Sequence, residues 1–79
     1  MKYCSIQDFF YLIRAEFHSG GNATPFTVFD LLEVARIKGY NLTQEKAIKY
    51  LNHLIKAEWV TVDSGQYKNV LWNYRKWIY

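Results

Sequence analysis

Residues 41–56 of the chain read NLTQEKAIKYLNHLIK, and this stretch decides how the rest of the sequence is interpreted. One face of it carries apolar residues at the spacing of a single buried stripe on an α-helix. These residues are Ala47, Ile48, Leu51, Leu54 and Ile55. Thr43 stands at the start, where its hydroxyl can accept a hydrogen bond from a free amide of the first turn. The pattern predicts a helix over residues 44–57 with Thr43 as its N-cap.

The opposite face of this predicted helix is basic. At about 100° of rotation per residue, its polar side lies away from the apolar stripe. That side carries Lys46, Lys49, His53 and Lys56. A helix with a basic outer face, next to a glycine-led turn and a β-hairpin signal, is typical of nucleic-acid recognition. The alternative is an amphipathic helix whose lysines only keep its outer face solvated.

Two further helices precede this one. Residues 5–8, SIQD, form a capping box with Asp at its third position, and apolar residues at helical spacing follow. They predict a first helix over residues 5–18. Residues 27–30, TVFD, repeat the box and predict a second helix over residues 28–38.

The connections after the second helix are short. Residues 39–42, GYNL, separate it from the Thr43 cap, and a glycine-led turn of this length is typical of a helix-turn-helix. After the third helix the pattern changes to that of strands, around the turn signal DSG at residues 63–65. We therefore predict a β-hairpin over residues 59–72. Residues 73–79 are compatible with either strand or helix.

Length and composition limit the class of protein. The chain has 79 residues, of which 51% are hydrophobic and 19% aromatic, which suits one small folded domain. Cys4 is the only cysteine, so we expect no disulfide and an intracellular, reducing setting. No signal peptide and no membrane span is expected. Neither His18 nor His53 has a partner spaced for metal binding or catalysis, so we expect no metal, no cofactor and no enzymatic activity.

The positive charge is concentrated in the second half of the chain. The net charge is +3. Residues 1–39 hold four basic and four acidic side chains, whereas residues 40–79 hold six basic and three acidic ones. Such an asymmetry is expected of a half that binds a polyanion.

The order of elements resembles the winged helix-turn-helix family over roughly residues 5–72. The order is a helix, an extended connection at residues 23–26 that can carry a short strand, a helix, a tight turn, a helix and a hairpin. The resemblance implies an α+β, mainly α, fold and a single domain over residues 1–79. In that family a glycine-containing bend often joins the third helix to the hairpin. Here residues 57–59, AEW, stand at this place, so either the bend is made without glycine or the helix runs slightly longer.

The resemblance also implies a function, that of a small protein that binds double-stranded DNA, with a transcription regulator as the first expectation. Its third helix would enter the major groove and its hairpin, the wing, would lie on the adjacent backbone. Matched to this sequence, the expected DNA-binding residues are Thr43, Gln44, Lys46, Lys49, Tyr50, His53, Lys56, Gln66, Tyr67 and Lys68. Gln44 and Glu45 lie at the end that most easily reaches base edges, although Glu45 would repel phosphate. We expect no small-molecule ligand.

The aromatic residues near the C-terminus exceed what one small core needs. We expect the surplus to form a homodimer interface. The expected interface residues are Trp72, Tyr74, Trp77 and Tyr79. Filling of the core and stacking on single-stranded bases are the alternative interpretations. A two-fold dimer would place two recognition helices about 34 Å apart and predicts a palindromic site.

Two other functions remain open at this stage. Winged helices also serve as protein-interaction modules, and the heavy aromatic content fits such a role. A non-specific DNA-binding accessory of replication or recombination would bind scrambled duplexes equally well. A chain that consists of little but a DNA-binding unit is common among viral and mobile-element regulators, which is an analogy only.

Overall fold

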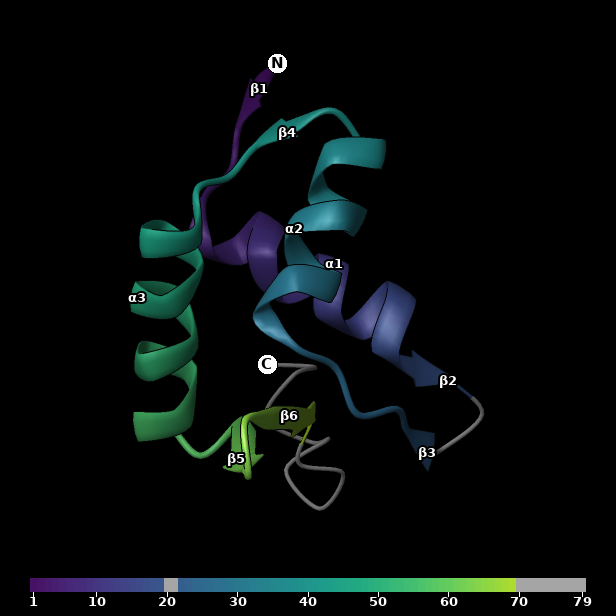
Figure 1. The fold of residues 1–79 in the computed structure, drawn as a ribbon, viewed down its shortest axis with the longest axis vertical. Helices are drawn as coiled ribbons and strands as arrows, with labels where there is room; N and C mark the ends of the chain where they lie inside the picture. The colour runs from purple at the N-terminus through teal and green to yellow at the C-terminus, as the bar shows by residue number, and fades with distance from the viewer. Residues whose placement is uncertain (20–21, 70–79) are drawn as a thin grey trace.

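The structure, a computed structural model, describes residues 1–19 and 22–69. Its helices are α1 (Ile6–Phe17), α2 (Val28–Ile37) and α3 (Gln44–Lys56). An antiparallel hairpin of β5 (Val60–Asp63) and β6 (Gln66–Asn69) follows α3. Figure 1 shows α3 standing along one side of the molecule, with the hairpin next to its C-terminal end. The α+β, mainly α, architecture is as the sequence predicts.

Two pairs of very short strands are also present, and of their four strands only β3 overlaps a segment that was expected to carry one. Strand β1 (Lys2–Tyr3) pairs in parallel with β4 (Tyr40–Asn41), which lies in the turn between α2 and α3. Strands β2 (His18–Ser19) and β3 (Asn22–Ala23) form an antiparallel pair after α1. Strands of two residues have no periodicity that a sequence pattern could reveal. The β1–β4 pair matters most, because it holds the start of the chain beside the N-terminal end of α3 (Figure 1).

All three helices begin at the predicted caps. Ser5 Oγ accepts a hydrogen bond from the Asp8 amide at 3.1 Å, and the Asp8 carboxylate accepts one from the Ser5 amide at 3.2 Å. Thr27 and Asp30 form the second capping box in the same way. Thr43 Oγ1 accepts from the Lys46 amide at 3.2 Å. The side-chain oxygens thus satisfy amides that have no partner inside the helix.

The bend after α3 is made without glycine, which is the first of the two expected alternatives. Glu58 adopts the left-handed conformation with φ of 66°. Its amide donates to the Ile55 carbonyl and the Trp59 amide donates to the Leu54 carbonyl, both at 3.0 Å. This pair of hydrogen bonds is the Schellman motif, in which glycine usually occupies the left-handed position. Gly39 fills the equivalent position after α2, with φ of 85°.

Replacing Glu58 by glycine is expected to stabilise the fold relative to replacing it by alanine. A residue with a Cβ atom in the left-handed region costs about 1–2 kcal/mol, and glycine removes this strain. Alanine removes the rest of the side chain but keeps the strain. We therefore expect Glu58→Gly to exceed Glu58→Ala in free energy of unfolding by about 1 kcal/mol, measured by chemical denaturation.

Gly39 provides the matched control for this prediction. A Cβ atom added at Gly39 would meet nothing within 4 Å, so that only the backbone conformation opposes a side chain there. Gly39→Ala is expected to lower the free energy of unfolding by about 1 kcal/mol. Equal stabilities for Glu58→Gly and Glu58→Ala, alongside a destabilised Gly39→Ala, would contradict strain at the end of α3.

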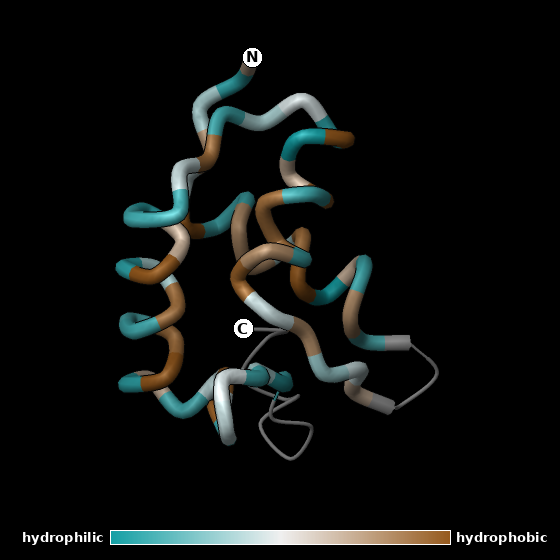
Figure 2. The backbone as a smooth tube through the Cα atoms, viewed as in Figure 1, coloured by the Kyte–Doolittle hydropathy of each residue, from teal (hydrophilic) through white to brown (hydrophobic). Residues whose placement is uncertain are grey.

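One hydrophobic core joins the three helices to the hairpin. Figure 2 shows that the hydrophobic positions of α3 face the interior and its hydrophilic positions face outward. The largest fully buried side chains are Phe9, Phe26, Ile13, Leu31, Leu51, Val60 and Cys4. Ile48 was expected in the buried stripe, but it is 39% exposed. The buried face is centred on Ala47, Leu51 and Leu54, and Ile48 lies about 100° around the helix from Ala47, at the edge of that face.

The connection before α2 is anchored to the hairpin. Phe26 and Tyr67 form an antiparallel bridge in which each amide donates to the other's carbonyl, at 2.9 and 2.8 Å. Of the connection at residues 23–26 that was expected to carry a short strand, Ala23 lies in β3 and Phe26 forms this single bridge. The Phe26 ring is buried, with its centroid 4.7 Å from that of Phe17 and 5.9 Å from that of Tyr67. Phe26 therefore connects α1, the connection and β6.

The predicted hairpin over residues 59–72 is confirmed as far as Asn69, and residues 70–72 lie outside the described part. The alternatives for residues 73–79 lie outside it as well. Among the residues that the structure describes, no helix is both long enough and apolar enough to span a bilayer.

Candidate nucleic-acid interface

The outermost line of α3 is fully accessible to a partner. Exposed residues follow one another along it at i, i+4, i+7 and i+11. They are Glu45, Lys49, Asn52 and Lys56. Within residues 1–19 and 22–69, neither Lys49 nor Lys56 takes part in a salt bridge. Their charges are therefore available for a polyanion.

Most of the expected DNA-binding residues are exposed. On α3 and its cap these are Thr43, Gln44, Lys49, His53 and Lys56, and on β6 they are Gln66 and Lys68. Asn52 is an exposed residue that the sequence analysis missed, although its helical spacing from Lys49 and Lys56 could have revealed it. An asparagine side chain can form two hydrogen bonds to the edge of adenine.

Tyr50 was expected on the exposed face, and this expectation is wrong. Its side chain is half-buried, and its hydroxyl donates a hydrogen bond to the Cys4 carbonyl at 2.9 Å. Its ring packs edge-on against Phe9, with the centroids 5.3 Å apart. Burial, with the neighbouring Tyr3, raises the pKa of Tyr50 to about 12, so the hydroxyl remains a donor at neutral pH. Tyr50 thus attaches the start of the chain to α3.

Removing the Tyr50 hydroxyl is expected to loosen this attachment. Tyr50→Phe keeps the ring but deletes the hydrogen bond, so the free energy of unfolding should fall by about 1 kcal/mol. Cys4 is fully buried. The labelling rate of its thiol under native conditions therefore reports opening of this segment and should rise about fivefold.

Tyr11→Phe is the matched control, because Tyr11 is 67% exposed and should tolerate the change without effect. Equal labelling rates for Tyr50→Phe and the wild type would contradict an anchoring role for the Tyr50 hydroxyl.

Tyr67, expected to contact DNA from the hairpin, also has a structural role. It is half-buried, its backbone pairs with Phe26, and its ring stacks on the Phe26 ring. Lys68 and Gln66 flank it on β6 and are exposed. The hairpin therefore offers a lysine and a glutamine to a partner, while Tyr67 holds the strand against the core.

Lys46 is half-buried at the flank of α3 and is held by aromatic rings. Its Nζ atom lies 3.8 Å from the centroid of the Tyr3 ring and 5.8 Å from that of Tyr50. Both distances are within the range of a cation–π interaction. Tyr3 was not among the expected site residues, because only the unpredicted β1–β4 pair brings it to α3.

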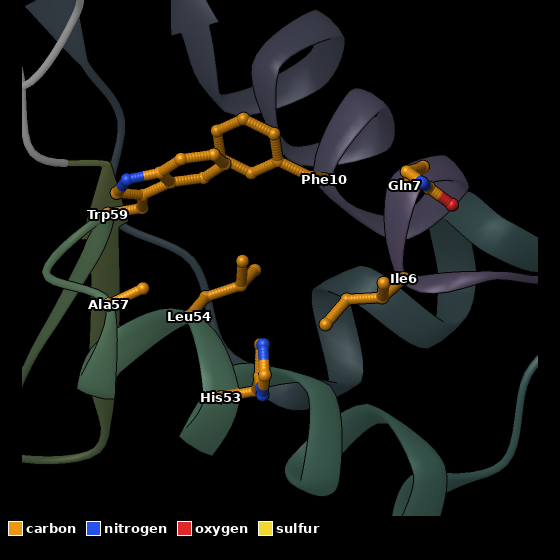
Figure 3. A pocket seen from close by; sticks show the side chains of 7 residues that line it. All are labelled: Ile6, Gln7, Phe10, His53, Leu54, Ala57 and Trp59. Carbon is orange, nitrogen blue, oxygen red and sulfur yellow. The ribbon is translucent and has the colours of Figure 1, made fainter. Parts of the chain in front are cut away.

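An apolar hollow of about 270 Å³ lies between α1 and the C-terminal end of α3 (Figure 3). Its lining residues are Ile6, Gln7, Phe10, His53, Leu54, Ala57 and Trp59. The Phe10 and Trp59 rings meet at one end, with centroids 4.8 Å apart. Gln7, His53 and the indole N–H of Trp59 are the polar groups among these residues, so this lining offers no carboxylate pair and no nucleophile with a base. Its chemistry suits an apolar contact.

No protein-family model, curated protein or solved structure matches the chain. The expected dimer residues, Trp72, Tyr74, Trp77 and Tyr79, lie outside the described residues. The candidate site therefore consists of the outer face of α3, the flanking Tyr3 and Lys46, and the exposed side chains of β6.

Proposed function

We propose that the protein binds double-stranded DNA as a winged helix-turn-helix, with α3 in the major groove and the β5–β6 hairpin on the adjacent backbone. One observation carries the proposal: the outermost line of α3 presents Lys49 and Lys56, and neither is in a salt bridge within the described part of the chain. Exposed, unpaired cations can neutralise phosphates and release their counterions, which supplies much of the affinity of a protein for DNA.

The arrangement of the elements supports the same function. The Thr43 cap and the turn with β4 join α2 to α3, as in a helix-turn-helix. The Phe26–Tyr67 bridge lies where the winged-helix order places a short first strand, and it fixes β6 relative to the helices. A hairpin held in this way next to the C-terminal end of α3 can contact the same duplex as the helix (Figure 1).

The side chains divide into two kinds of contact. Gln44 and Asn52 are exposed and can form paired hydrogen bonds with adenine edges. Lys49 and Lys56, with Lys68 on the hairpin, are suited to phosphates, which fix position and not sequence. Glu45 repels phosphate, whereas its carboxylate can accept a hydrogen bond from cytosine if it faces a base edge. We propose transcription regulation by a homodimer on a palindromic site as the biological role.

A salt titration tests the proposal. Fluorescence anisotropy with a random-sequence duplex, from about 50 to 200 mM salt, measures the number of phosphates neutralised. Six or more phosphate contacts would reduce the affinity by roughly a thousandfold across this range. An absence of binding at the lowest salt, by protein shown to be folded, would refute DNA binding.

A protein-interaction module is the second candidate function, and the apolar hollow beside Trp59 favours it. That function uses the seam between α1 and α3 and leaves the outer lysines unused. The interaction module therefore predicts that a variant with Lys49 and Lys56 both replaced by glutamate still binds its protein partner. The DNA-binding proposal predicts that the same variant no longer binds the duplex.

A further inference from the structure

Strand β1 brings an exposed tyrosine to the flank of α3. Tyr3 is paired with Asn41 in the β1–β4 ladder, and Asn41 lies three residues before Gln44, the first residue of α3. Tyr3 is nevertheless 69% exposed. A large side chain fixed by its backbone but left open to solvent is well placed to contact a partner bound along α3.

The neighbouring Lys46 is held in place but not neutralised. The Tyr3 and Tyr50 rings restrict its ammonium group through cation–π contacts. These contacts leave the full positive charge in place, and within the described residues Lys46 forms no salt bridge. Much of the side-chain entropy that binding would cost a free lysine has thus been lost on folding.

The surroundings of the Tyr3 hydroxyl favour negative charge. The Tyr50 hydroxyl and the Lys46 ammonium group lower the pKa of Tyr3. A position that favours a phenolate oxygen also favours a phosphate oxygen beside it, because the Lys46 ammonium group stabilises either negative charge. The cation–π geometry, with Lys46 Nζ 3.8 Å from the centroid of the Tyr3 ring, places this cation beside the Tyr3 side chain.

The following inference rests on the DNA binding proposed above. We propose that Tyr3 and Lys46 together bind one phosphate of the DNA backbone, at the edge of the groove that α3 enters. The Tyr3 hydroxyl donates a hydrogen bond to a phosphate oxygen, and the Lys46 ammonium group forms an ion pair with the same phosphate. This contact adds Tyr3 to the DNA-binding surface. It also gives Lys46 a positioning role on the backbone, which leaves Gln44 and Asn52 to read bases.

The experiment compares variants in the salt titration described above. Lys46→Gln removes one phosphate contact, so the slope of log affinity against log salt should become shallower by about 0.9. Tyr3→Phe keeps the ring beneath Lys46 and removes only the hydroxyl. It should weaken binding about fivefold at every salt concentration, because a neutral hydrogen bond releases no counterion. The losses in the double variant should be less than additive, since both groups hold one phosphate.

Two surface variants serve as matched controls. Tyr11→Phe removes an exposed hydroxyl from α1, and Lys38→Gln removes a cation after α2 that pairs with Glu16 at 3.9 Å. Both should bind DNA as the wild type does. If the wild type binds the duplex and neither Tyr3→Phe nor Lys46→Gln changes that binding, the shared phosphate contact is overturned. The proposed DNA binding would then still stand. A folded wild type that does not bind duplex would overturn this contact and the proposed function together.

Discussion

Replacing Lys49 and Lys56 together by glutamate is expected to weaken duplex binding by at least about a hundredfold near physiological salt. Both side chains are exposed on the outermost line of α3, outside any salt bridge in the described chain. The substitutions remove two phosphate contacts and place two like charges against the backbone. Fluorescence anisotropy measures the loss. The fold should survive, because neither side chain belongs to the core.

The control for this prediction is a double variant with the same net charge. Arg36→Glu with Lys38→Glu also takes the formal charge from +3 to −1, since each substitution changes it by two. These residues lie at the C-terminal end of α2, where they pair with Glu33 and Glu16. The control should lose far less affinity than the α3 variant. Equal losses would show that overall charge governs binding and that α3 has no special role.

Replacing Phe26 by alanine is expected to lower the free energy of unfolding by about 3–5 kcal/mol. Phe26 is 1% exposed, and its ring stacks against Phe17 on α1 and Tyr67 on β6. No other described side chain is stacked against both of these rings. A small domain has little stability to spare, so this loss should leave much of the protein unfolded at 37 °C. Thermal unfolding followed by circular dichroism measures the effect.

Phe29 offers the matched control, because it is also a phenylalanine near the start of α2 but is 67% exposed. Phe29→Ala should change the free energy of unfolding by no more than about 0.5 kcal/mol. If Phe26→Ala were as stable as Phe29→Ala, the stacking of the Phe26 ring on Phe17 and Tyr67 would not be what holds the hairpin. The position of the hairpin relative to α3 would then need another explanation.

The helices could be predicted because local chemistry determines their ends. Each capping hydroxyl accepts a hydrogen bond from the amide three residues later in the chain. The caps can therefore be recognised in the sequence, at Ser5, Thr27 and Thr43. The glycine at residue 39 and the absence of glycine from residues 57–59 could likewise be identified from the sequence, whereas the left-handed position of Glu58 could not. The exposed positions of Lys49 and Lys56 follow from helical periodicity alone.

The parts that could not be predicted depend on contacts between distant residues. The β1–β4 pair joins residues about 38 positions apart through strands of two residues, for which no periodic signal exists. The wrong expectation that Tyr50 is exposed follows from the missed β1–β4 pair. A tyrosine at the border between the buried and exposed faces of a helix can point either way, because it is amphipathic. Here the hydrogen bond from the Tyr50 hydroxyl to the Cys4 carbonyl fixes its orientation, and that carbonyl is distant in the sequence.

The measurement that tests the central claim most directly is an NMR titration of the ¹⁵N-labelled protein with a short duplex at about 50 mM salt, where electrostatic binding is strong. Our account predicts that the largest amide shifts fall on residues 43–56 and on β6, with smaller shifts near Tyr3. Shifts confined to the α1 and Trp59 side of the apolar hollow, or no shifts from a folded protein, would contradict DNA binding through α3.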